Sequence, residues 1–206
     1  MRRIRTWDDV GAGDLGSIAG TGFLSDAIIH ATQRADLLDG VPIPSHSFLV
    51  LSRFQVIEAL ERVVVRPRAV YRQAFEDGHV QIYRPDAPDY LVKAVLVGLR
   101  KDYLGRAYGW GQIIAFLPVL LWRRLTGQDA VNLLPLGTIC SELVTVYCRR
   151  LLDACSRSGL YSQALALAWA SALDPNTTDP ALLLACEQRD SLPPSFAGAA
   201  QGAGHD

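Results

Sequence analysis

One cysteine of the chain lies where its sulfur could act as a nucleophile. Cys140 follows Leu136–Gly137 and lies near the start of the apolar stretch 138–152, which has the pattern of a buried helix with Thr138 as its N-cap. In the first turn of a helix, unpaired backbone N–H groups and the helix dipole favour a thiolate over a thiol, and they can also form part of an oxyanion hole. The alternative is that Cys140 is a small buried core residue. Cys148 and Cys155 lie deeper in the same stretch and are predicted to be core residues.

A thiolate nucleophile needs a base, and histidine is the usual one. The chain has four histidines: His30, His46, His79 and His205. His46 is the strongest candidate because it lies at the start of the apolar, strand-like run 45–51. Its alternative role is structural.

The acid that could orient His46 is Glu58, which lies in the otherwise apolar run 54–65. We expect this run to form a hairpin with 45–51 through a loop at 51–53, which places Glu58 directly opposite His46 with about 5 Å between their Cβ atoms. A carboxylate in apolar surroundings needs a partner, and beside an imidazole it fixes the tautomer and stabilises the imidazolium. A register shifted by one residue would instead make Glu61 a diagonal candidate.

The surrounding pattern predicts an α+β fold with a small antiparallel sheet. Strands are expected after the turn 11–16 and at 45–51, 54–65 and 79–84. Helices are expected at 25–34, 89–104, 138–152 and directly after Asp179. We expect one domain over residues 1–190 with an apolar insertion at about 105–137, followed by a disordered tail at 191–206.

Composition excludes several classes of function. The 206 residues include 20 Lys and Arg against 21 Asp and Glu, so no basic excess is available for nucleic acid. No apolar segment follows the charged N-terminus, and the longest apolar run, 113–122, has about half of the ~20 residues that a membrane-spanning helix needs. We therefore expect a cytoplasmic protein whose four cysteines are thiols, with no zinc site.

Three motifs resemble those of the circularly permuted papain-like cysteine hydrolases, the YiiX-like branch of the NlpC-type superfamily. They are SHSFLV at 45–50, VIEA at 56–59 and ICSELV at 139–144. Their order is also similar to the permuted arrangement, in which the histidine strand comes first and the nucleophile helix last. With weaker similarities elsewhere, the likeness covers roughly residues 11–187.

This resemblance implies a papain-like fold in which an antiparallel sheet or half-barrel packs against a buried helix that carries the nucleophile. It implies a Cys140–His46–Glu58 triad in a cysteine peptidase or amidase that cleaves an amide bond through a thioacyl-enzyme. No metal or organic cofactor is required. The candidate substrates are peptides, cell-wall-derived peptides and acyl-amide conjugates.

Four further residues are candidates for substrate contact. Ser45 and Ser141 flank His46 and Cys140, while Tyr108 and Trp110 lie among glycines and either line a substrate cleft or pack in the core.

The apolar run 113–122 leaves two other functions open. It packs in the core, or it forms a lid, an acyl-chain groove or a membrane-touching face together with Arg123–Arg124. In the second case the chain would be a thiol acyltransferase or lipid esterase with peripheral membrane contact through 113–124. A third alternative is a catalytically silent module that binds a peptide in the same cleft.

Overall fold

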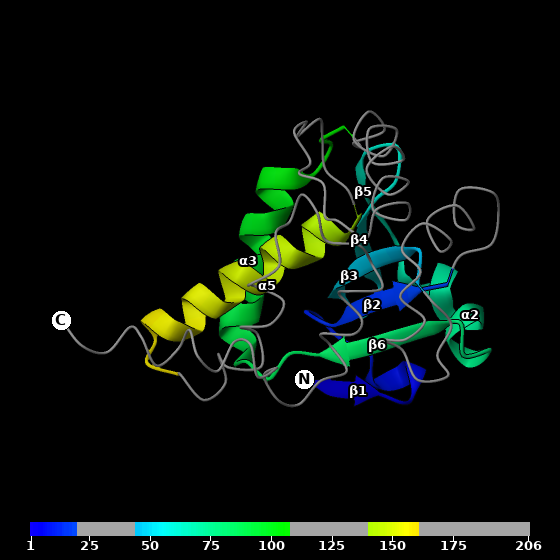
Figure 1. Ribbon diagram of the computed structural model, residues 1–206, viewed down its shortest axis with the longest axis horizontal. Helices are drawn as coiled ribbons and strands as arrows, with labels where there is room; N and C mark the ends of the chain where they lie inside the picture. The colour runs from blue at the N-terminus through cyan, green and yellow to red at the C-terminus, as the bar shows by residue number, and fades with distance from the viewer. Residues whose placement is uncertain (20–43, 108–139, 161–206) are drawn as a thin grey trace, which may run out of the picture.

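The computed structural model describes residues 1–19, 44–107 and 140–160 of the chain. Over these ranges the protein is a mixed α+β structure built on a six-stranded antiparallel sheet with the strand order β1-β6-β2-β3-β4-β5 (Figure 1). The strands are β1 (Arg2–Ile4), β2 (Leu15–Ile18), β3 (His46–Ser52), β4 (Gln55–Ala59), β5 (Val63–Pro67) and β6 (Val80–Arg84). The helices are α2 (Arg72–Glu76), α3 (Asp89–Tyr103) and α5 (Cys140–Arg157), with short 3-10 helices η1 (Trp7–Asp9) and η3 (Arg68–Tyr71). The predicted α+β class with an antiparallel sheet is confirmed.

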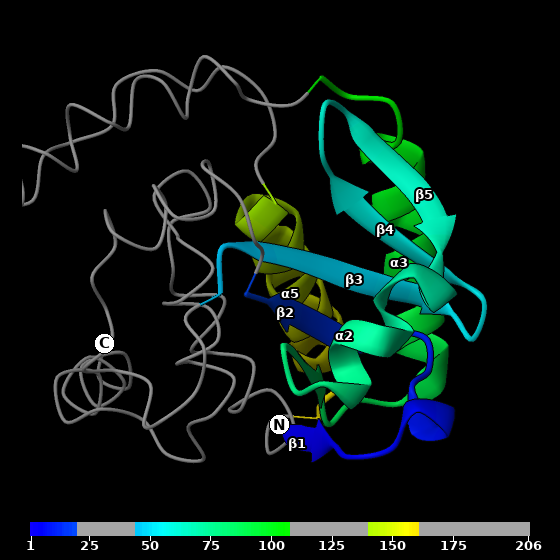
Figure 2. The same cartoon turned by 90° about the vertical axis from the view of Figure 1, so that its right-hand side faces the viewer.

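Each face of the sheet carries its own apolar layer, as the alternation of side chains along a strand requires. Leu49 of β3 and Ile57 of β4 are fully buried on one face, where α3 and α5 pack. Phe48 and Val56 are fully buried on the other face, against η1 and η3. Figure 2 shows this arrangement, with α3 and α5 behind the sheet and α2 in front of it.

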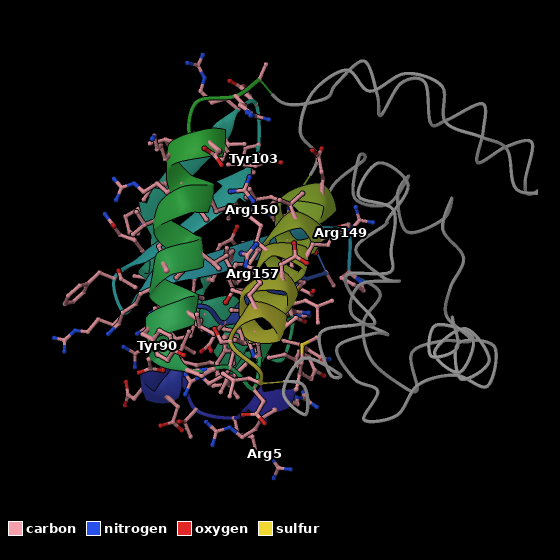
Figure 3. The ribbon with its side chains drawn as sticks, turned by 90° about the vertical axis from the view of Figure 1, so that its left-hand side faces the viewer. Arg5, Tyr90, Tyr103, Arg149, Arg150 and Arg157 are labelled. Carbon is pink, nitrogen blue, oxygen red and sulfur yellow. The ribbon has the colours of Figure 1, made fainter. Side chains whose placement is uncertain are left out.

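Helix α5 buries one continuous apolar stripe against the sheet. The stripe has the spacing of a single helical face and consists of Cys140, Leu143, Val144, Tyr147, Cys148, Leu151 and Cys155. Figure 3 shows α3 and α5 side by side, with Arg150 of α5 directed toward Tyr103 of α3. Arg150 also forms a 2.7 Å ion pair with Asp102, but both side chains are over a third exposed, so apolar burial contributes most of the stability of this contact.

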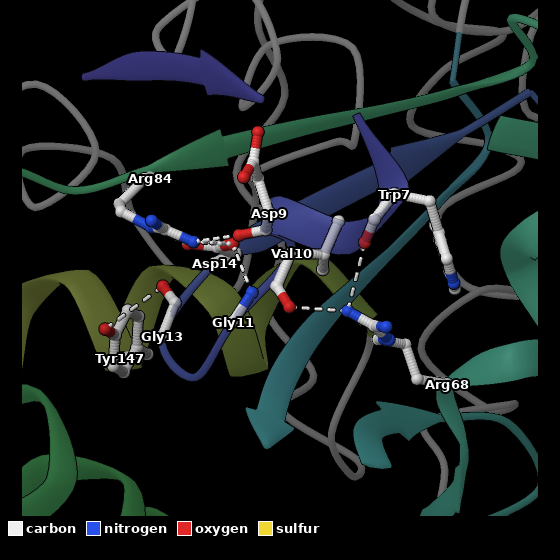
Figure 4. A network of polar contacts seen from close by, with 9 residues as sticks. All are labelled: Trp7, Asp9, Val10, Gly11, Gly13, Asp14, Arg68, Arg84 and Tyr147. Atoms are coloured by element: carbon white, nitrogen blue, oxygen red, sulfur yellow. Dashed lines mark hydrogen bonds and ion pairs between the residues drawn. The ribbon is translucent and has the colours of Figure 1, made fainter. Parts of the chain in front are cut away.

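The turn before β2 ties α5 to the sheet (Figure 4). The buried carboxylate of Asp14 accepts hydrogen bonds from the backbone N–H of Gly11 at 2.8 Å and from the Arg84 guanidinium at 2.7 and 2.8 Å. The Tyr147 hydroxyl of α5 donates to the Gly13 carbonyl in the same turn at 3.2 Å. The turn therefore sets where α5 lies along the sheet.

The run 54–65, predicted as one strand, forms parts of two strands. β4 ends at Ala59 and β5 begins at Val63, with a turn between them in which Glu61 and Arg62 are exposed. Successive side chains of a strand point to opposite faces, and both faces of this sheet are buried. A strand that continued through these two positions would bury a charge on each face, so the chain turns there instead. This reversal adds a strand to the predicted sheet.

The predicted register of the first hairpin is wrong by two residues. Glu58 was predicted to lie opposite His46 but lies opposite Phe48, so His46 is a diagonal neighbour of Glu58 and does not face it directly. The cause is a tighter turn with a register irregularity between Val50 and Ser52. A shift of two residues leaves every side chain on the same face, whereas a shift of one would have reversed them.

Other predictions agree with the structure or lie outside the part that it describes. The predicted strands at 45–51 and 79–84 correspond to β3 and β6, and the helix at 89–104 corresponds to α3. The helix predicted at 138–152 is described from Cys140 and continues to Arg157, while β1 was not predicted. The helices predicted at 25–34 and after Asp179, the apolar insertion beyond residue 107 and the tail at 191–206 lie outside the described residues. Among the described helices, none is long and apolar enough to cross a bilayer.

Replacing Gly16 by alanine is expected to lower the free energy of unfolding by about 1–3 kcal/mol, because a Cβ there would lie 2.1 Å from the ring of Phe48. Gly98→Ala in α3 is the matched control. The nearest atom to its new Cβ is 3.8 Å away, so better helix propensity should raise stability by about 0.5–1 kcal/mol. Urea denaturation measures both, and effects of the same sign would contradict this account of how Phe48 is held.

Candidate active site

His46 and Glu58 form a direct contact at the start of β3. His46 is the first residue of that strand, and its Nε2 lies 2.7 Å from Oε2 of Glu58 on β4. The Glu58 side chain is 0% exposed and the His46 side chain 18% exposed, so water competes little for this hydrogen bond. The contact expected from the sequence is therefore present, although it is made diagonally.

Three donors surround the Glu58 carboxylate. Oε2 accepts from His46 and from the Tyr71 hydroxyl, and Oε1 accepts from Nη1 of Arg66 at 3.3 Å. Burial works to raise the pKa of Glu58, but the hydrogen bonds and charges of these three partners outweigh it and lower the pKa. Glu58 is therefore an ionised acceptor at neutral pH.

Cys140 interacts with the same imidazole. It is the first described residue of α5, which begins beside the start of β3 (Figure 2), and it is 5% exposed. Burial alone would lower the pKa of His46, but the charge and hydrogen bond of Cys140, together with those of Glu58, raise it to about 10. Because Nε2 is bonded to Glu58, Nδ1 is the ring nitrogen that remains for Cys140.

This arrangement can form a thiolate–imidazolium pair with a carboxylate behind the imidazolium. The attraction that keeps the proton on His46 equally favours the negative charge on Cys140, since the two effects are one interaction. Such a pair supplies both a nucleophile and a nearby proton donor.

The remaining candidates are placed as follows. Ser45 is buried, and its backbone N–H donates to the Ile18 carbonyl at 3.0 Å, which continues the pairing of β2 with β3. Ser141 is the second residue of α5, but its side chain lies outside the described part. Tyr108 and Trp110 also lie outside the described residues. Glu61, the alternative acid, is exposed in the turn between β4 and β5.

Two residues of the site were not singled out from the sequence, namely Tyr71 and Arg66. Tyr71 ends η3 and Arg66 lies on β5, diagonal to Glu58 in the β4–β5 register. Arg66 is the one charged residue in β5, whose other residues are Val63, Val64, Val65 and Pro67. A single charge in an apolar strand could have indicated a partner for the buried carboxylate. No pattern near Tyr71 indicated its hydrogen bond.

The other described cysteines lie away from the site. Cys148 and Cys155 are 0% exposed further along α5, and neither they nor Cys140 form a disulfide. Among the described residues, no group of three or more His, Cys, Asp and Glu side chains could hold a metal ion.

Comparisons with known proteins found no relative of this chain. No protein-family model matches the chain, and neither the curated proteins nor the solved structures contain a match to it.

Proposed function

We propose that this protein is a cysteine hydrolase with a Cys140–His46–Glu58 triad on a circularly permuted papain-like fold. The observation that carries the proposal is the convergence of Cys140 and a fully buried, ionised Glu58 on one imidazole, with 2.7 Å between His46 and Glu58. Further support comes from the chain order, in which the histidine and acid strands precede the cysteine helix.

In this mechanism the Cys140 thiolate attacks a carbonyl carbon, and the electron pair of the C=O bond moves to oxygen. Backbone N–H groups of the first turn of α5 stabilise that oxyanion. His46 then gives its proton to the leaving group as the tetrahedral intermediate collapses to a thioester. Water attacks the thioester while His46 removes its proton, and the Cys140 thiolate leaves.

An amide is the substrate bond that this site suits best. An amine is a poor leaving group unless it is protonated, and His46, with a pKa raised to about 10, carries a proton at neutral pH. The substrate class that follows is a peptide or another acyl amide, including cell-wall-derived peptides.

Alkylation of Cys140 by iodoacetamide is expected to proceed at similar rates at pH 6 and pH 9. A thiolate paired with an imidazolium keeps its charge across this range, whereas an ordinary thiol of pKa about 8.5 loses reactivity about tenfold for each pH unit below that value. Peptide-level mass spectrometry of the native protein measures the rate at each cysteine. The buried Cys148 and Cys155 serve as internal controls and should remain unmodified.

Two results would contradict the proposal. One is a Cys140 rate that falls from pH 9 to pH 6 as an ordinary thiol does, which would favour a silent binding module. The other is equal modification of Cys140, Cys148 and Cys155, which would remove any special reactivity from the start of α5.

A further inference from the structure

The oxygen of Glu58 that contacts His46 has a second donor. The Tyr71 hydroxyl donates to Oε2, the same atom that lies 2.7 Å from Nε2 of His46. The remaining contact of the carboxylate, from Arg66 to Oε1, is longer at 3.3 Å and comes from a side chain that is 41% exposed. Solvent therefore competes with Arg66 but not with Tyr71, which is 7% exposed.

We infer that Tyr71 is a positioning residue of the triad, which holds Oε2 of Glu58 where it can orient His46. This inference rests on the proposed function, because positioning matters only if His46 serves Cys140. In this role Tyr71 takes no part in the bond changes and acts through Glu58.

Tyr71 is itself rigidly held, as a positioning residue must be. Its ring stacks on that of Phe48 with 4.1 Å between centroids and 1° between planes. Phe48 lies directly opposite Glu58 in the β3–β4 pairing and is packed over Gly16, where any larger residue would collide with its ring. The phenol is thus supported by the same two strands that carry the acid and the histidine.

The hydroxyl also remains a donor throughout the working pH range. Burial and the neighbouring charge of Glu58 raise the pKa of Tyr71 above its usual value, so the phenol stays protonated. Without this donor, His46 alone would hold Oε2 against the attraction of Arg66 on the other oxygen, and the carboxylate would shift toward Arg66 and away from His46.

Tyr71→Phe in the full-length protein tests the inference. Phenylalanine keeps the stacking on Phe48 and removes only the hydroxyl. The rate of Cys140 alkylation by iodoacetamide is measured from pH 3.5 to pH 9, and its midpoint is expected to rise by about one unit, a tenfold loss of preference for the thiolate. The rise follows because a displaced Glu58 stabilises the His46 imidazolium less.

Two variants serve as controls. Tyr147→Phe also removes a buried hydroxyl, which donates to the Gly13 carbonyl away from Glu58, and should leave the midpoint unchanged. Arg66→Gln removes the weaker, partly exposed donor and should shift the midpoint by less than half a unit.

The possible outcomes separate the inference from the proposed function. A wild-type Cys140 with the profile of an ordinary thiol would overturn both. A wild-type low midpoint that Tyr71→Phe leaves unchanged would overturn the positioning role alone. A midpoint that falls in Tyr71→Phe would also overturn the positioning role, because it would mean that the phenol only withdraws negative charge from the Glu58 carboxylate. An effect of Arg66→Gln equal to that of Tyr71→Phe would also count against it.

Discussion

Replacing His46 by alanine is expected to make Cys140 behave as an ordinary thiol. The ratio of its alkylation rates at pH 6 and pH 9, close to one in the wild type, should fall roughly a hundredfold, because the substitution removes the imidazolium charge that stabilises the thiolate. Any amide hydrolysis by the wild type should fall by a factor of about 10²–10⁴, as expected when a general base is removed.

His79→Ala is the matched control for this variant. His79 is exposed directly before β6 and lies outside the network around Glu58, so its removal should change neither the alkylation ratio nor the turnover. Two outcomes would contradict the assignment of the base: unchanged Cys140 reactivity in His46→Ala, or an equal loss in His79→Ala.

Glu58→Gln is expected to lower turnover by about a hundredfold or more with little change in KM, while the protein remains folded. The amide cannot supply the negative charge that stabilises the His46 imidazolium, and its NH₂ group can face a ring nitrogen in the wrong orientation. Because the carboxylate accepts from three donors in a fully buried position, the free energy of unfolding should also fall by about 1–3 kcal/mol.

Glu61→Gln makes the same chemical change three positions along the chain, in an exposed turn. It should alter stability by less than about 0.5 kcal/mol and leave turnover unchanged. Steady-state kinetics and chemical denaturation of the two variants give the comparison. A Glu58→Gln protein with wild-type turnover would remove Glu58 from the mechanism.

Much of the fold could be predicted because it depends on local pattern. The apolar run of β3, the alternation in β6 and the helical spacing of α3 and α5 each follow from which side chains must avoid water. The boundary between β4 and β5 was harder to predict, since Glu61 and Arg62 interrupt the apolar run only briefly. Reading those two charges as a turn would have separated the strands correctly.

The hairpin register could not be predicted in the same way. It depends on the geometry of a turn and an irregularity near Ser52, which change the pairing without changing the hydrophobic pattern. The expected contact between His46 and Glu58 survives the error because a displacement of two residues preserves the face and leaves diagonal neighbours within reach.

The sequence by itself determined which residues could do chemistry: a cysteine at the start of a buried helix, a histidine at the start of a strand and a glutamate among apolar neighbours. Only the tertiary structure decided that Glu58 receives Tyr71 and Arg66 as well as His46, and that Cys140 meets the same imidazole. The physical reason is that these contacts join segments far apart in the chain. Their geometry depends on how the strands pair and how α5 packs against the sheet, and no local pattern encodes either.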